Sequence, residues 1–141
     1  MSANKIHLLG TGRLAEYVAA AALSPGHLIE LTSAGTVQKQ STADKGAEKM
    51  FAMEDSLQGN TIATAYAAAD QVRAVIASPG DHVQAFLAAG ETAVIGSKLC
   101  ANGDGTLKVV TGTEVVLAIA LEAQDLSDTG DVDTLTKVRV L

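Results

Sequence analysis

The sequence predicts a mainly β protein, a barrel or sandwich made of two related β units, and three observations carry this prediction. A hairpin pattern, in which a turn glycine precedes alternating apolar residues and a small, Gly-containing tetrad, occurs at residues 25–37 and again at 96–107. Two Ser-Pro-Gly turns lie at residues 24–27 and 78–81. The apolar segments between the turns are short and regularly spaced, which is typical of all-β sandwiches and barrels.

The two hairpin patterns indicate an internal repeat. Ile29 and Gly35 align with Leu99 and Gly105, 70 positions later and without a gap. The offset then falls to 68 and 66 in two further matches, which are 51–55 with 119–123 and 72–75 with 138–141. We therefore infer that residues of about 26–78 and 96–141 are two copies of one β unit. A twofold repeat is not a solenoid, which needs three or more stacked units.

The remaining elements follow from local patterns. Residues 50–54 are expected to form a strand, and residues 71–78 and 82–87 an antiparallel hairpin around the second Pro-Gly turn. A helix of one or two turns is expected within residues 57–70, because apolar residues have helical spacing there after a possible cap at Asn60-Thr61. Residues 40–49 are polar and predict a loop. Two aliphatic segments, 115–121 and 135–141, predict the closing strands.

The composition excludes several classes of protein. The 141 residues suit one domain, and the net charge of −6 with scattered basic residues excludes a nucleic-acid surface. No apolar segment reaches 18 residues, and no signal peptide is recognisable, so we expect no membrane association and synthesis in the cytoplasm. The single cysteine, Cys100, lies among alternating strand residues and is interpreted as a small buried hydrophobe.

No catalytic or metal-binding pattern emerges from the polar residues. The three histidines lack metal-ligand spacing. Four aspartates at residues 125–133 lack the EF-hand register and predict a solvated surface loop. Glu54 and Glu122 follow equivalent strands, so a carboxylate pair for glycoside chemistry is conceivable, but duplication explains their placement better. We therefore expect no enzyme and no cofactor.

One glycine motif supports a competing interpretation. Residues 10–15 match the G-x-G-x-x-A pattern of dinucleotide-binding folds, and the acidic Glu30 follows at a distance suited to a ribose contact. This alternative makes the chain a nucleotide-binding enzyme fragment that uses the Gly10-Thr11-Gly12 turn. The pattern requires a βαβ unit, whereas hairpins follow Val37, so we interpret the glycines as a bend in an extended N-terminal arm.

Several segments, taken in order, resemble the decoration (cement) proteins of tailed bacteriophages. These segments are 14–18, 23–26, 53–59, 65–66, 83–88 and the repeat at 96–107. The resemblance implies a β-tulip-like barrel that acts as a homotrimer on the outer capsid surface of the virion, over the threefold or quasi-threefold sites. It also implies that residues 1–16 form an N-terminal arm that binds the major capsid protein, with residues 17–141 as a single β domain.

The resemblance assigns capsid contact to a defined set of arm residues. These are Lys5, Ile6, His7, Leu8, Leu9, Gly10, Thr11, Gly12, Arg13, Leu14 and Glu16. Because the repeat begins after the arm, the chain without residues 1–16 is expected to stay folded. A β-barrel module that binds glycans or other small ligands is the remaining alternative.

Overall fold

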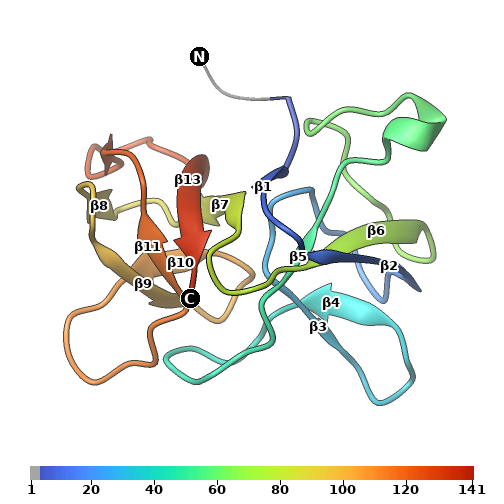
Figure 1. Cartoon of the computed structure of the whole chain (residues 1–141), viewed down its shortest axis with the longest axis horizontal. Helices are drawn as coiled ribbons and strands as arrows, with labels where there is room; N and C mark the ends of the chain where they lie inside the picture. The colour runs from blue at the N-terminus through green and yellow to red at the C-terminus, as the bar shows by residue number, and fades with distance from the viewer. Residues whose placement is uncertain (1–3) are drawn as a thin grey trace.

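The computed structural model describes residues 4–141, which fold into two halves of similar build that lie side by side (Figure 1). The mainly β prediction is confirmed, since the described chain contains strands and one short 3-10 turn, η1 (Ser56–Gln58). The first half holds β2 (Arg13–Val18), β3 (Ile29–Leu31), β4 (Val37–Lys39), β5 (Met50–Ala52) and β6 (Gln71–Ile76). The second holds β1 (His7–Leu9), β7 (His82–Leu87), β8 (Thr92–Ala93), β9 (Lys98–Ala101), β10 (Leu107–Val109), β11 (Ala118–Ala120), β12 (Gln124–Asp125) and β13 (Thr134–Val140).

The second half is a closed five-stranded barrel. Its strands follow the order β7-β10-β9-β11-β13, and β13 returns to β7. The β7–β13 pairing covers all of β7, from Thr134 opposite Leu87 to Arg139 opposite His82. The parallel contact of Leu107 with Leu87 completes the ring. Strand β1 adds to the part of β7 that β10 does not reach.

The first half repeats this plan with weaker closure. Strands β2, β6 and β5 form one sheet, and β3 and β4 form a hairpin. Two single bridges join these pieces: Leu28 with Phe51, and the parallel bridge of Ala19 with Val37. The second bridge corresponds to the pair Leu87 and Leu107, so β2 is the counterpart of β7. We call the two halves the first and second barrel.

The predicted repeat is confirmed in its hairpins. In the first barrel Leu31 lies opposite Val37, and in the second Ala101 lies opposite Leu107, which preserves the offset of 70. Both loops turn through a glycine with positive φ, 81° at Gly35 and 84° at Gly105. The shared loop residues therefore encode one turn geometry twice.

The predicted alignment of the last strand is wrong by two residues. Met50 lies opposite Ile76, and its counterpart Ala118 lies opposite Val140, so the structural offset is 64 rather than 66. The similar Val-Arg pairs of these strands thus occupy shifted positions. A shift of two keeps side chains on the same face, so the burial pattern alone does not reveal it.

The second Pro-Gly turn forms, but the predicted hairpin around it is wrong. The Asp81 N–H group donates to the Ser78 carbonyl at 3.0 Å. The flanking strands do not pair with each other, because β6 lies between β2 and β5 while β7 lies in the second barrel. The turn instead connects the two barrels.

The predicted helix is also misplaced. The 3-10 turn η1 lies at its start, and residues 60–70 form an irregular loop. Tyr66 accounts for this, because it bridges to Leu23 and its hydroxyl donates to the Met53 carbonyl beneath the loop. No helix within residues 4–141 is long and apolar enough to span a membrane.

Two apolar cores fill the molecule. One lies inside the first barrel and includes Ile29, Met50 and Val72. The larger core fills the second barrel and also contains Phe51 and Val75, which lie on strands of the first barrel. The larger core therefore crosses the seam between the barrels, and the two repeats form one continuous body.

His27 lies at this seam as a buried, neutral base. It is 8% exposed, its Nδ1 atom accepts from the Ser24 N–H group at 2.9 Å, and its ring lies 4.6 Å from that of Phe86. Burial, together with the charge of Lys39, lowers the pKa of His27 from 6.5 to about 4. A charged imidazole is therefore disfavoured between the barrels.

This burial predicts a loss of stability in mild acid. Below a pH of about 6.5 the unfolded chain binds a proton on His27 that the folded chain does not bind until about 4, so the free energy of unfolding falls across that interval. The lowering of the pKa corresponds to about 3 kcal/mol.

Urea unfolding of the wild type and of His27→Gln, from pH 7 to pH 4, measures this loss of unfolding free energy. The free energy of unfolding of the variant should depend less steeply on pH. His82→Gln serves as the control and should keep the wild-type slope; equal slopes for all three proteins contradict the assignment.

Candidate functional site

The segment expected to be an N-terminal arm is built into both barrels. His7 of β1 pairs with Val83, and Ile6 is fully buried in the larger core. Strand β2 pairs with β6 along its whole length, from Arg13 to Val18. Residues 5–16 are therefore part of the folded body, and residue 16 falls inside a strand. Without them the second barrel loses Ile6 and the first loses most of one wall, so the chain lacking residues 1–16 is not expected to fold.

Strand β1 is held by side chains of both barrels. The Ile6 N–H group donates to Glu54 Oε2 at 3.0 Å, and Glu54 is only 8% exposed. On the opposite side, the Gln84 N–H group donates to the Ile6 carbonyl at 2.8 Å, and Gln84 Nε2 donates to the Lys5 carbonyl at 2.8 Å. These bonds fix the backbone of the segment at the point where Ile6 enters the core.

Asp81 holds the other end of β1. Its carboxylate accepts from the Thr11 N–H group at 3.1 Å, from the Ser78 N–H group at 3.1 Å and from His7 Nε2 at 3.2 Å. Asp81 is only 2% exposed, and burial acts to raise the pKa of its carboxyl group. The N–H groups of Ser78, Thr11 and Gly12 and the nearby His7 outweigh this effect, so the pKa of Asp81 lies below the ordinary value. One carboxylate thus connects β1, the glycine turn and the link between the barrels.

The Asp81 carboxylate explains the glycines that resemble a dinucleotide motif. A Cβ atom on Gly10 would lie 1.9 Å from Asp81 Oδ1, and one on Gly12 would lie 2.6 Å from Oδ2. Gly10 also has a φ of 124°, which L side chains rarely adopt. The turn leads into a strand instead of a helix. The nucleotide-binding interpretation is therefore wrong, because the turn encloses a carboxylate of its own chain and lacks the βαβ context.

Part of the predicted capsid-contact set remains accessible to a partner. Leu9 is 60% exposed and Leu14 is 58% exposed, and they lie on either side of the glycine turn. The other exposed members of the set are Lys5, Gly10, Thr11, Arg13 and Glu16. Ile6 is buried, and His7, Leu8 and Gly12 are partly buried. The accessible surface is therefore the turn from β1 to β2 and the outer side of β2.

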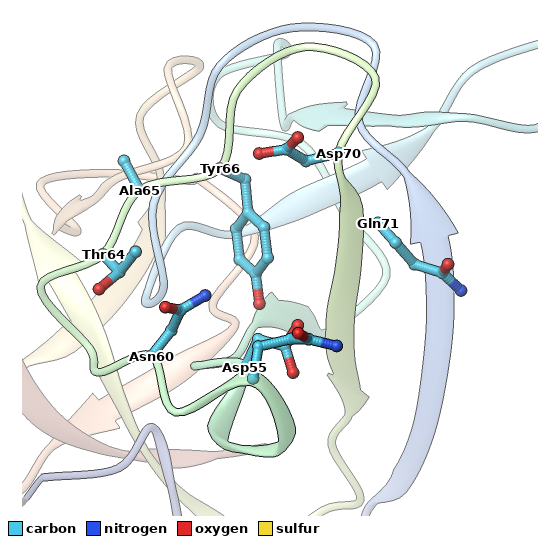
Figure 2. A pocket seen from close by; sticks show the side chains of 8 residues that line it. Asp55, Asn60, Thr64, Ala65, Tyr66, Asp70 and Gln71 are labelled. Carbon is cyan, nitrogen blue, oxygen red and sulfur yellow. The ribbon is translucent and has the colours of Figure 1, made fainter.

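An open polar hollow of about 430 Å³ lies beside Tyr66 on the first barrel (Figure 2). Its lining comprises Asp55, Gln58, Asn60, Thr64, Ala65, Tyr66, Asp70 and Gln71. Asp70 already accepts from the Ala67 N–H group at 2.8 Å. The lining contains two carboxylates, several amides and no basic side chain, which suits a hydroxyl-rich or cationic ligand. No sequence pattern predicts this hollow, because the spacing of apolar residues favours a helix within residues 57–70.

A second cluster of polar groups is a structural ion pair. Single ligand atoms of Asp44, Cys100 and Glu114 lie within 4.8 Å of one another. Lys108 Nζ lies 2.6 Å from Asp44 Oδ1 and supplies the positive charge. Cys100 is fully buried, and burial raises the pKa of its thiol, which fits the interpretation as a core residue.

The other carboxylates singled out in the sequence stabilise local structure. Glu122 Oε1 accepts from the Lys137 N–H group at 3.0 Å, while Glu54 is engaged with Ile6. The structure thus gives the two acids separate backbone partners. In the acidic loop, Asp125 accepts from Ser127, and Asp133 accepts from the Ala89 N–H group at 2.9 Å. The solvated-loop prediction is confirmed for Asp133, whereas Asp125 is exposed but belongs to the short strand β12.

Comparison with known proteins identifies a similar fold. No protein-family model matches the sequence, and no curated protein sequence matches it. Among solved structures, the chain is similar to the N base of the head fiber gp8.5 of bacteriophage phi29, with a TM-score of 0.60 and 11% sequence identity. The match covers 93% of this chain and 95% of the other. At this identity the likeness establishes a shared fold that includes both barrels.

The Asp81 contacts predict a measurable role in stability. Asp81→Asn removes the charge and one acceptor, so the N–H groups of Thr11 and Ser78 lose part of their buried partner, and the free energy of unfolding at pH 7 should fall by about 1–3 kcal/mol. The folded pKa of Asp81 lies below its unfolded value, so this difference is present above the unfolded pKa and disappears as the pH falls through the folded pKa. Urea unfolding measures both effects.

Asp128→Asn, at an exposed position, is the matched control, and its free energy of unfolding should equal that of the wild type. An unchanged free energy of unfolding for Asp81→Asn would show that the Asp81 contacts are dispensable.

Proposed function

We propose that this protein is a structural component of a tailed-phage virion that binds the outside of the assembled capsid as a homotrimer and stabilises it. The observation that carries the proposal is the near full-length likeness to a phage head-fiber base, which covers both barrels. The order of sequence segments that resembles decoration proteins supports the same class independently. The partner in this proposal is the major capsid protein, and the chain acts without catalysis.

The surface that we assign to capsid contact is the β1–β2 turn with the outer side of β2. It presents two exposed aliphatic side chains, Leu9 and Leu14, beside the exposed cation of Arg13. The turn is anchored from beneath by Asp81. A pre-ordered turn loses less conformational entropy on binding than a disordered arm does. Arg13 suits an acidic partner surface.

Stabilisation of the shell follows from mass action. A protein that binds the assembled shell, but not its dissociated subunits, shifts the equilibrium toward the shell. Three linked subunits raise the effective concentration of each contact surface, so a trimer binds far more tightly than one chain does. Contacts between aliphatic side chains tolerate salt, whereas surface charge pairs are screened.

The polar hollow supports a second candidate function. Its carboxylates and amides, together with Tyr66, suit a neutral, hydroxyl-rich ligand such as a glycan. Glycan-array binding that Asn60→Ala abolishes would support this function. The hollow adjoins the proposed capsid surface, because Gln71 of its lining pairs with Val18 of β2 and donates to Glu16.

The proposal predicts that addition of the protein raises the temperature at which shells release their genome or dissociate. Heating decorated and undecorated particles side by side, at low and moderate salt, tests it; the gain should persist at moderate salt. Sedimentation of the purified chain should give a trimer. The double variant Leu9→Ser and Leu14→Ser should lose attachment, whereas Leu57→Ser, which changes another exposed leucine, should not. A monomer that never binds shells, or equal release temperatures, would rule the proposal out.

A further inference from the structure

Among the strands of residues 4–141, β2 has one sheet edge that no other strand covers along most of its length. It lies at one side of the sheet β2-β6-β5, and β4 reaches only its C-terminal end, through the bridge of Ala19 with Val37. The strand is six residues long, and Leu14 and Val18 on its outer face are 58% and 45% exposed. Long edges with exposed aliphatic residues tend to pair with other chains, so natural proteins usually cover them.

The second barrel shows how the equivalent edge is covered. There, β1 lies along β7, and the Gln84 N–H group donates to the Ile6 carbonyl at 2.8 Å. Just beyond β7, the Ala88 N–H group donates to the Leu107 carbonyl. In the first barrel, the Ala20 N–H group donates to the Val37 carbonyl in the same way. These matched bonds make Glu16 the counterpart of Gln84, 68 positions earlier. Within residues 4–141, the chain therefore covers one of two equivalent edges and leaves the other open.

Backbone directions on β2 follow from the alternation of antiparallel bonds. The Ala19 N–H group donates to the Asp70 carbonyl at 2.8 Å, toward the β6 side. Neighbouring residues of a strand point their backbone groups to opposite edges, so Tyr17 and Ala15 also bond toward β6. The backbone groups of Leu14 and Glu16 consequently point to the open edge, as those of Gln84 do toward β1.

We propose that the open edge of β2 binds an extended segment of the capsid subunit by β-strand addition, which gives the first barrel the strand that β1 supplies to the second. This proposal rests on the proposed function and specifies its contact. The side chains of β2 define the partner: aliphatic residues beside Leu14 and Val18, and a basic residue between them beside Glu16. The backbone groups of Leu14 and Glu16 supply the hydrogen bonds.

A second copy of this chain fits the edge less well. Two β2 strands related by a twofold axis overlap most when the axis passes near the middle of the strand, at Ala15 or Glu16. Centring on Ala15 sets Leu14 against Glu16, and centring on Glu16 sets that carboxylate against itself. Both arrangements are unfavourable, since like charges directly opposite each other destabilise a pair and an aliphatic residue gains little against a carboxylate. The described strand that could serve as a donor, β1, is already paired with β7.

The test compares two substitutions at one residue. Glu16→Pro removes the outward N–H group without removing a bond to β6, and proline is tolerated where an edge N–H faces solvent. Glu16→Ala removes the carboxylate and keeps the N–H group. Binding of both full-length variants to empty shells of the phage that encodes the chain is measured, with thermal unfolding as a check of folding. The proposal predicts about a tenfold or greater loss of affinity for Glu16→Pro and a smaller change for Glu16→Ala.

Hydrogen exchange of the wild-type chain supplies an independent measurement. The amides of Leu14 and Glu16, which point to the open edge, should become protected when shells are added and not when the free protein is concentrated. If the wild type fails to bind shells, the proposed function fails. If the wild type binds and Glu16→Pro binds equally well without protection of β2, the edge proposal fails and the proposed function stands. Protection on concentration alone identifies a second copy as the occupant and also overturns the edge proposal. Should Glu16→Pro unfold, the exchange result decides.

Discussion

The structure depends on one buried carboxylate at the point where three segments meet. Asp81 follows the turn that links the barrels, and it accepts hydrogen bonds from that turn, from the glycine turn and from His7 of β1. A buried carboxylate is costly unless donors surround it, so this arrangement is stable only while all three segments are in place. The glycines at 10 and 12 are required because a Cβ atom at either position would collide with the carboxylate. The fold of the N-terminus and the junction of the barrels are thereby coupled.

The two barrels show how one unit diverges after duplication. Both keep the same hairpin and the same strand order, but the second is closed by continuous pairing and carries β1 on its outer edge. The first is closed by single bridges. It gains stability from the seam instead, where Phe51 and Val75 enter the core of its neighbour. The weaker barrel is thus supported by the stronger one, and its edge is left available for other contacts.

Local signals in the sequence were sufficient for elements whose partners lie nearby. The turn at 32–36 and the echo at 102–106 predict their hairpins because a glycine with positive φ and an adjacent aliphatic strand determine that geometry alone. The partners of β1 could not be predicted in this way, since Glu54 and Val83 lie 48 and 76 residues beyond Ile6 and His7. The polar hollow could not be predicted, because Tyr66 has helical spacing in the sequence. In the structure its hydroxyl group instead donates to the Met53 carbonyl. The two-residue shift of the last strand could not be predicted, because Val72 corresponds to Thr136 in the structure. Both residues are fully buried, but a polar threonine does not match a valine in a sequence pattern.

An open edge must remain compatible with a chain that stays dispersed before it meets its partner. The two charges of β2, Arg13 and Glu16, are both exposed. Glu16 accepts from Gln71 Nε2 at 2.8 Å, which holds its carboxylate beside the strand. A charge in the middle of an edge opposes pairing of two identical strands and does not oppose a partner with a basic residue at that place. The net charge of −6 adds a general repulsion between copies. The same residue that prevents indiscriminate pairing therefore selects the sequence of the strand that β2 accepts.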